Sequence, residues 1–364
     1  MTTKQSYHYV PDYAVVPGET LAEMLSERRM TQAELARRTN RPLKTINEIV
    51  NGKSAITPET AIQLERVLGI AATFWTKLEL DYRTNVAFAE ERERLEAEID
   101  WLDQFPVKEM VRRQLIPDIS DRIGTMAAVL SFFGVSTTSA WARKWSSTGA
   151  MFRQSTAYPI SEGAVAVWLR WGELKAQQVA CKPYEAANFL DALTSIRRLT
   201  TKEPQVFEPA LKTLCANSGV AVVFVPEIGE TRASGATRWL TSDLALIQLS
   251  LRYRKDDQFW FTFFEEGAHV LLHGRRDFFI GGLGSQVDPA KEAEAKRWAA
   301  DFLIPRAALE QFVAKDTLTE LAIKHFAKDL EIAPGIVVGR LQHEKQLSWA
   351  TSLNRLKQTF VLVE

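Results

Sequence analysis

The N-terminal part of the chain consists of short apolar segments of helical period, separated by residues that end or begin helices. Leu21 and Leu25 lie at i and i+4, which places both on one face of a first helix. Thr31, with Glu34 three residues later, has the pattern of a capping box, so a second helix is expected over residues 32–38. The chain is therefore predicted to open with two short helices and a break between them.

A third and a fourth helix are predicted by the same signals. The third begins after Pro42 and ends at Asn51-Gly52, where glycine can adopt the left-handed conformation. Ile46 and Ile49 form its inner face, and Thr57-Pro58 opens the next helix, because proline is tolerated in a first turn. Two short helices joined by a tight turn, with polar residues on the outer face of the second, have the geometry that fits a major groove.

The central part of the chain is predicted to be helical. Between Phe88 and Phe105 the apolar residues Leu95, Ile99 and Leu102 recur at helical spacing among acidic neighbours. This narrow stripe suits packing against a partner helix or another domain, and a solvated linker helix is the alternative. The sequence that follows is mostly helical in pattern, and its tryptophans are expected in the core.

The C-terminal part changes to a mixed pattern. Two apolar, β-branched runs over residues 219–226 and 244–251 are bounded by turn residues and are predicted to be strands. A helix is expected over residues 257–274, and a later one begins at residues 292–295. The predicted fold is multidomain and mainly α, with an all-α domain over residues 1–85, a helical connector over 86–200 and an α+β domain over 201–364.

Composition narrows the class of protein. The chain of 364 residues is too long for one ordinary domain, and its 45 Lys and Arg balance its 45 Asp and Glu. A net charge of zero argues against a protein that coats nucleic acid indiscriminately. No apolar run approaches the roughly 18 residues of a membrane span, and the polar start lacks the pattern of a signal peptide. A cytoplasmic protein with no membrane partner is therefore expected.

Charge is concentrated on the predicted groove-binding segment. Residues 28–53 carry seven basic side chains against two acidic ones, a local excess of five positive charges. The geometry would point Lys44, Asn47 and Glu48 at base edges. The residues expected at phosphates, which fix position without reading sequence, are Gln32, Thr45, Asn51 and Lys53. The alternative is a small helical bundle with a solvated basic face.

These residues carry a resemblance to a known family. The stretch from Pro17-Gly18-Glu19 through MTQAELARRTNRPLKTINEIVNGKSAITPETAIQLERVLGIAATFWTKLELDY resembles the HigA-type branch of the Xre helix-turn-helix family, which has a lambda-repressor-like fold. Members of this branch are antitoxins that repress their own promoters. The resemblance implies a homodimer that binds double-stranded DNA at a palindromic operator, and a toxin as a protein partner.

The helix predicted over residues 257–274 has candidate metal chemistry. In zinc peptidases with the HExxH motif, two histidines at i and i+4 bind the metal, and the glutamate beside the first is the general base. Aligned to that motif, Glu265 takes the place of the first histidine, Glu266 that of the general base and His269 that of the second ligand. His273 follows His269 at a further helical turn.

A second resemblance covers the predicted α+β domain. FWFTFFEEGAHVLLHG, followed by EAEAKRWAADFLIP, resembles the ImmA/IrrE family of metallopeptidases, whose members are zincin-like and are commonly paired or fused with Xre-type domains. The resemblance implies a Zn²⁺ ion as cofactor. It assigns the third ligand to Glu294, with Glu292 as the second choice.

Glu265 limits the chemistry to be expected from this site. Two carboxylates would neutralise a dication and weaken its Lewis acidity, so a site of Glu265, His269 and Glu294 should turn over weakly or not at all. The alternatives are an intact hydrolase, a metal-binding but inactive domain, a different metal held by Glu265, His269 and His273, and a metal-free domain.

The two domains together predict a regulator. The favoured function is a sequence-specific, autoregulating DNA-binding protein of the antitoxin type, whose second domain senses a ligand or binds a partner protein. The alternative is an active zinc endopeptidase that cleaves a repressor or itself. A pure toxin-binding module whose DNA-binding domain serves only autoregulation is a third hypothesis.

Overall fold

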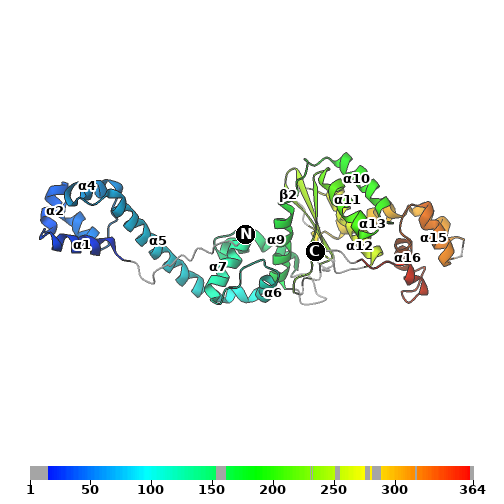
Figure 1. Cartoon of the computed structure of the whole chain (residues 1–364). Helices are drawn as coiled ribbons and strands as arrows, with labels where there is room; N and C mark the ends of the chain where they lie inside the picture. The colour runs from blue at the N-terminus through cyan, green and yellow to red at the C-terminus, as the bar shows by residue number, and fades with distance from the viewer. Residues whose placement is uncertain are drawn as a thin grey trace. The chain divides into compact units, whose positions relative to one another are not determined.

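The computed structural model describes residues 15–152, 161–229, 231, 233–250, 255–274, 279–280, 288–315 and 318–360, without the side chains of 146–152. The polar start of the chain and residue 251 of the second expected strand lie outside the described residues. The chain divides into two compact units, Met1–Ile99 and Asp100–Glu364, whose elements are labelled in Figure 1. Each unit has its own hydrophobic core.

The first unit is all-α in its described residues, as the sequence predicts. Leu21, Leu35, Ile46 and Trp75 are fully buried where its helices meet. Its helices are α1 (Pro17–Glu27), α2 (Gln32–Thr39), α3 (Leu43–Val50), α4 (Pro58–Leu68) and α5 (Ala72–Ala97). The domain boundary expected between residues 85 and 86 lies within α5, which continues without a break.

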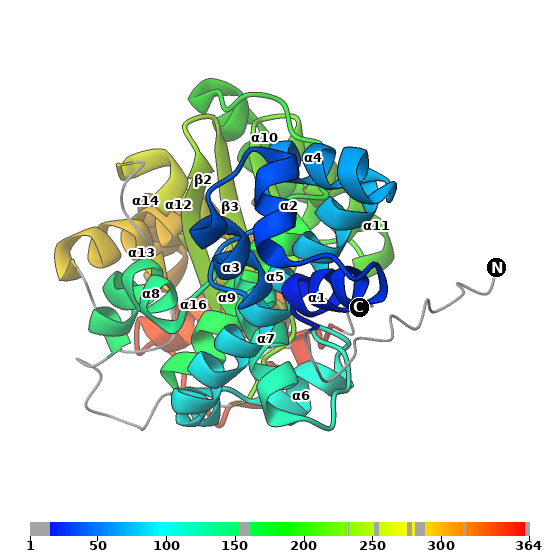
Figure 2. The same ribbon diagram turned by 90° about the vertical axis from the view of Figure 1, so that its left-hand side faces the viewer.

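Short-range chemistry determines where α2 and α3 begin and end. Thr31 Oγ1 accepts a hydrogen bond from the Glu34 amide at 3.1 Å and caps α2, and Thr57 caps α4 in the same way. Asn40 ends α2 in the left-handed conformation with φ 54°, and Pro42 directly precedes α3. The connection between the two helices is therefore tight, and both face the viewer in Figure 2.

The second unit surrounds a small sheet with helices. Before the sheet come η1 (Ile99–Gln104), which spans the boundary of the units, α6 (Val107–Arg112), α7 (Arg122–Phe133), α8 (Thr138–Phe152), α9 (Glu162–Ala176), α10 (Ala186–Leu199) and α11 (Pro204–Ala216). The later helices are α12 (Asp256–Leu272), α13 (Pro289–Leu303), α14 (Arg306–Val313), α15 (Glu320–Asp329), α16 (Pro334–His343) and η2 (Ser352–Leu356).

The sheet has the strand order β1-β3-β2-β4. Its described strands are β1 (Val220–Phe224), β2 (Gly235–Thr241), β3 (Leu244–Leu249) and β4 (Phe279–Ile280). β1 is parallel to β3, whereas β2 is antiparallel to both β3 and β4. β1 and β3 correspond to the two expected strands. β2 was not expected, because its sequence GATRWLT lacks a clear alternation of apolar and polar residues. In the structure only the first half of this strand is buried.

The sheet is covered on both faces, since neighbouring residues of a strand point to opposite sides. Ile247 and Leu249 of β3 join the core that also contains residues of α12. Gln248 points the other way and donates from Nε2 to the Trp168 carbonyl of α9 at 2.7 Å. Trp168 in turn donates from Nε1 to the Val225 carbonyl at 2.9 Å. Part of the expected connector therefore packs against the sheet itself.

One segment of the second unit, Arg122–Trp145, is long and apolar enough to resemble a membrane span. No apolar segment of this length was predicted from the sequence. Gly134, with φ 65°, ends α7 in the middle of this segment. Phe133 of α7 packs edge-on against Trp141 and Trp145 of α8, with centroid distances of 5.8 and 5.7 Å. The apolar residues on either side of the break thus pack against one another, and these tryptophans are buried as predicted.

Candidate functional site

The outer face of α3 is the first candidate site. Lys44 has 85% of its side chain exposed, and Asn47 one turn later is also exposed. On the opposite face Ile46 and Ile49 are buried in the core of the first unit. α3 therefore presents a polar surface to solvent because its apolar residues are taken up by the other helices.

Amide side chains connect α2 to this surface. Asn47 Nδ2 donates to Gln32 Oε1, the first residue of α2, at 3.3 Å. Asn51 Nδ2 donates to Asn47 Oδ1 at 3.1 Å and to the Asn47 carbonyl at 2.7 Å. These contacts orient three of the predicted DNA-binding residues along one edge of α3, where amide groups can still exchange partners with a ligand.

The other predicted DNA-contacting residues border the same surface. Glu48 is half-buried and its carboxylate lies 3.8 Å from the Lys44 ammonium. Thr45 is half-buried in the first turn of α3, and Lys53 is exposed just beyond the helix. All seven predicted residues therefore lie on α3 or directly beside it.

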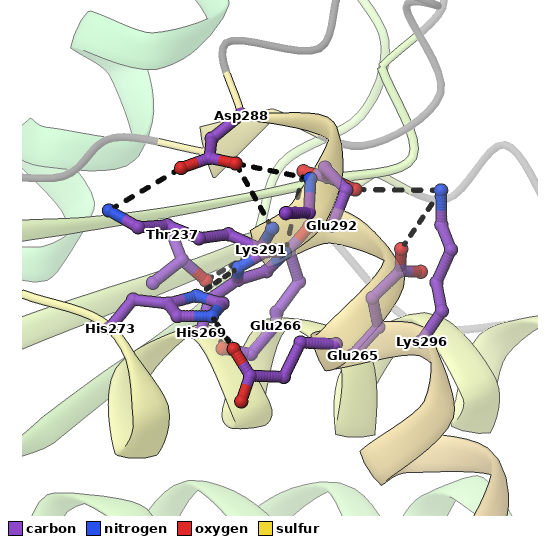
Figure 3. A network of polar contacts seen from close by, with 11 residues as sticks. Thr237, Glu265, Glu266, His269, His273, Asp288, Lys291, Glu292 and Lys296 are labelled. Atoms are coloured by element: carbon purple, nitrogen blue, oxygen red, sulfur yellow. Dashed lines mark hydrogen bonds and ion pairs between the residues drawn. The ribbon is translucent and has the colours of Figure 1, made fainter.

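The second candidate site is a buried polar cluster between α12 and α13 (Figure 3). Glu265 and His269 lie one turn apart on α12, and Glu292 comes from the first turn of α13. One ligand atom from each of these three residues lies within 4.8 Å of the other two, and all three residues are buried. His269 Nε2 is 3.5 Å from Glu292 Oε1.

The structure places Glu292, and not Glu294, beside Glu265 and His269. Glu294 has 55% of its side chain exposed and lies 3.3 Å from His273 Nε2. The two glutamates are two residues apart, so helical geometry points them in widely different directions. Of the two glutamates considered for the third ligand position, the second choice, Glu292, is the one that lies beside the other two residues, and it shares the buried face of α13 with Ala295 and Ala299. Ala295 and Ala299 follow Glu292 at i+3 and i+7, which places Glu292 on the apolar face of the helix. This spacing is the sequence signal that would have identified Glu292.

Glu266, predicted as the general base, points toward the sheet. Thr237 of β2 donates from Oγ1 to Glu266 Oε2 at 2.6 Å and to the Glu266 carbonyl at 3.1 Å. A side chain at Gly235 would place its Cβ 2.6 Å from Glu266 Oε1, so the strand needs a glycine there. Thr237 was not predicted as a site residue, because β2 itself was not predicted.

Lys296 supplies the positive charge of the cluster, and sequence analysis did not single it out. Its ammonium lies 3.7 Å from Glu265 Oε1 and 3.5 Å from Glu292 Oε2. Burial raises the pKa of Glu265 to about 7, against the lowering effect of Lys296. Burial likewise raises the pKa of Glu292, and it raises that of Glu266 well above its ordinary value. The spacing of Glu292 and Lys296, i and i+4, was the available signal.

The ligand atoms of the cluster are of the types that bind zinc, but the positive charge of Lys296 beside them is unfavourable for a metal ion. Two carboxylates and an imidazole are ordinary zinc ligands. The Lys296 ammonium, however, already lies within 3.7 Å of both carboxylates, and a cation bound by the same oxygens would be repelled by it. Of the buried polar atoms that lack a hydrogen-bond partner among the described residues, none belongs to Glu265, His269 or Glu292. As arranged, the residues do not fit a metal ion.

His273 does not join this cluster. Its Nδ1 lies 2.9 Å from His269 Nδ1, so the two rings contact each other through the nitrogen that faces away from Glu292. Phe279 of β4 stacks on the His269 ring at a centroid distance of 3.8 Å. The alternative arrangement, a metal held by Glu265, His269 and His273, has no support from this geometry.

A cavity of about 540 Å³ adjoins the cluster. Glu265 and Lys296 line its wall on the side of the cluster, and Asp257, Phe261, Arg340 and His343 line it elsewhere. A partly open cavity lined by charged and aromatic side chains is typical of small-molecule sites. The cavity lies between α12, α13 and α16, within the second unit.

Comparison with known proteins agrees with this division of the chain. The model of the helix-turn-helix family matches residues 21–75, and the model of the IrrE N-terminal-like domain matches residues 240–342. An uncharacterised HTH-type transcriptional regulator of Escherichia coli, YddM, is 35% identical over 63 residues, which are 17% of this chain and 67% of that protein.

Two similar solved structures each cover about a quarter of this chain. The antitoxin HigA of Pseudomonas aeruginosa, solved with the higBA promoter, is 33% identical, with 24% of this chain and 95% of that chain covered and a TM-score of 0.22. An addiction module antidote protein of the HigA family from Coxiella burnetii is 31% identical, with 23% and 94% covered and a TM-score of 0.22.

Proposed function

We infer that this chain, which belongs to the helix-turn-helix family and carries an IrrE N-terminal-like domain, is a transcriptional regulator that binds a specific DNA sequence through α3. The observation that carries the proposal is the exposed polar face of α3. Lys44 and Asn47 point into solvent there, next to the short turn after α2.

The assignment of individual contacts follows from chemistry. A lysine and an amide side chain on an exposed helix can read base edges in a major groove, Lys by donating to guanine and Asn by pairing with adenine. Gln32, Asn51 and Lys53 lie at the margins of the same surface, where phosphates would be reached. In this arrangement Asn47 exchanges its contact with Gln32 for a base when DNA binds.

The resemblance to the HigA-type branch extends the proposal to the partners. We propose that the protein binds a palindromic operator as a homodimer, because two-fold symmetry in the DNA is matched by two-fold symmetry in the protein. As an antitoxin, the protein would also repress its own promoter and neutralise a toxin. The residues of α3 support the DNA contact directly, whereas the toxin rests on the family resemblance alone.

The second unit is proposed to sense a ligand or a partner protein. The cavity beside the cluster is lined by charged side chains of both signs and by Phe261, so it suits a ligand that has both polar and apolar groups. A zinc endopeptidase is the second candidate, and the gathering of Glu265, His269 and Glu292 favours it. The ammonium of Lys296 between the two carboxylates weighs against it, as does a Glu266 carboxylate bonded to Thr237.

DNA binding is tested with the full chain and a fragment from upstream of its own gene. Lys44→Ala and Asn47→Ala are each expected to lose specific affinity by about 1–3 kcal/mol, with little change on a scrambled fragment. Lys53→Ala is expected to weaken binding to both fragments alike, since a phosphate contact carries no sequence information. Gel shifts and fluorescence anisotropy at fixed low salt measure both quantities.

The matched control for these variants is Lys77→Ala, an exposed lysine in α5 of the same unit. It should leave the affinity for both fragments unchanged. If the wild-type protein gives no shift with its upstream region at low salt, or if Lys44→Ala and Lys77→Ala behave alike, α3 is not the recognition helix.

A further inference from the structure

We propose that Lys296 is the built-in counter-cation of the α12–α13 cluster, so that its ammonium takes the place of a metal ion and the second unit is metal-independent. The proposal concerns the second unit and does not depend on DNA binding by the first.

Acidic and basic side chains alternate in the cluster. In Figure 3 the groups form a row in which His269 faces Glu292, Glu292 faces Lys296, and Lys296 faces Glu265. The three separations are 3.5, 3.5 and 3.7 Å. Each oxygen of Glu292 has a different neighbour, because Oε1 is the atom near His269 and Oε2 the atom near Lys296.

Lys296 is held in the cluster by its position on α13. It lies one turn after Glu292 on α13, so the helix itself brings the two side chains together. Its ammonium also reaches across to Glu265 on α12, a helix that packs against α13. About half of the Lys296 side chain is exposed, whereas each glutamate side chain is 10% exposed. The lysine side chain is therefore more exposed than the two carboxylates that its ammonium contacts.

A metal ion at this cluster would compete with the Lys296 ammonium for the same carboxylates. A zinc ion bonded to these carboxylates would lie about 2.0–2.2 Å from their oxygens, and the ammonium is 3.5 and 3.7 Å from the same two side chains. Two cations at such spacing in a partly buried site repel each other strongly. A metal ion and the Lys296 ammonium are thus alternative cations for this cluster. The ammonium is part of the chain and does not have to be bound from solution.

The test compares metal content and thermal stability of the full chain in the wild type and in Lys296→Met. The wild type is expected to carry no stoichiometric zinc, and its melting temperature should not respond to EDTA or to added zinc. Lys296→Met leaves two buried carboxylates without a cation. It is expected to melt earlier, to bind about one zinc ion per chain through Glu265, His269 and Glu292, and to recover stability on doing so.

Two further variants serve as controls. Lys296→Arg keeps the positive charge and should remain zinc-free. Lys324→Met removes a lysine of α15 that likewise pairs with a glutamate four residues earlier, Glu320 at 2.7 Å, outside the cluster. It should not acquire zinc binding, so a gain restricted to Lys296→Met reports on the cluster itself.

Zinc bound stoichiometrically by the wild type, with loss of stability in EDTA, would overturn the proposal, and so would a Lys296→Met protein of unchanged stability that binds no zinc. If Lys296→Met does not fold, the double variant Glu265→Gln/Lys296→Met removes one acid together with the ammonium. A double variant that folds without zinc supports the proposal that Lys296 compensates the charge of the carboxylates. Failure of the double variant to fold contradicts it. Gel shifts with the upstream DNA, run on the same samples, report on the first unit separately.

Discussion

At the scale of single residues, the buried acids of α12 show how burial changes ionisation. Asp256, the first residue of the helix, is fully buried. Its Oδ1 accepts a hydrogen bond from the Asp257 amide at 2.8 Å, and its Oδ2 has no hydrogen-bond partner among the residues that the structure describes. Burial raises its pKa to about 7. Asp257 is compensated by the Lys357 ammonium, 2.6 Å from its Oδ2. The two neighbouring aspartates thus have different surroundings, since the Lys357 ammonium lies directly against Asp257.

Asp256→Asn is expected to stabilise the second unit at pH 8 and to have a smaller effect at pH 5. From the ordinary pKa of an aspartate up to about 7, the folded state binds more protons at this carboxyl than the unfolded state, so stability falls as pH rises. Asparagine stays neutral and keeps the oxygen that Asp257 uses. Thermal unfolding at both pH values measures the difference.

The control for this prediction is Asp329→Asn, an exposed aspartate at the end of α15. It should change the melting temperature equally, and only slightly, at the two pH values. If Asp256→Asn were destabilising to the same extent at pH 5 and pH 8, its ionisation would not be what limits stability.

At the scale of elements, the orientation of α3 depends on close contact with α1. Gly18 lies in the first turn of α1, and a Cβ there would come 2.2 Å from the Val50 carbonyl oxygen and 2.3 Å from that of Ile49. Both atoms belong to the backbone of α3, so neither can rotate away. The missing side chain of Gly18 is therefore what lets the two helices approach.

Gly18→Ala is expected to lower the stability of the first unit by about 1–3 kcal/mol, as overpacking typically does. Because α3 must shift to make room, specific DNA binding should weaken even below the melting temperature. Circular dichroism and anisotropy with the upstream fragment measure the two effects. Glu23→Ala, an exposed position of the same helix, is the control and should alter neither. Unchanged stability and affinity in Gly18→Ala would contradict this account of the α1–α3 contact.

At the scale of the whole molecule, two separate cores predict two unfolding events. Ile46 belongs to the core of the first unit and Phe263 to that of the second, and both are fully buried. Ile46→Ala and Phe263→Ala should each destabilise one unit by roughly 2–5 kcal/mol and leave the other transition in place. Differential scanning calorimetry of the full chain resolves this. A single transition moved by both variants would show that the units unfold together.

The sequence predicted much of each unit and little of how the second unit is assembled. Thr31, Pro42 and the Asn51-Gly52 pair locate the ends of α2 and α3 because capping and turn formation involve only residues near in the chain. Glu265 and His269 were found in the same way, as neighbours on one helix. Glu292 was only the second choice for the third ligand, and Lys296 and Thr237 were not selected, because the contacts that matter to them cross between α12, α13 and β2.

Local interactions therefore let the sequence alone determine an N-terminal helix-turn-helix, the polar face of α3 and the helix with Glu265, Glu266 and His269. Tertiary packing decided the rest. It determined which glutamate of α13 faces α12, because two residues along a helix change the direction of a side chain almost completely. It also brought the ammonium of Lys296 between Glu265 and Glu292, and electrostatic interaction depends on distance in space, not on separation along the chain.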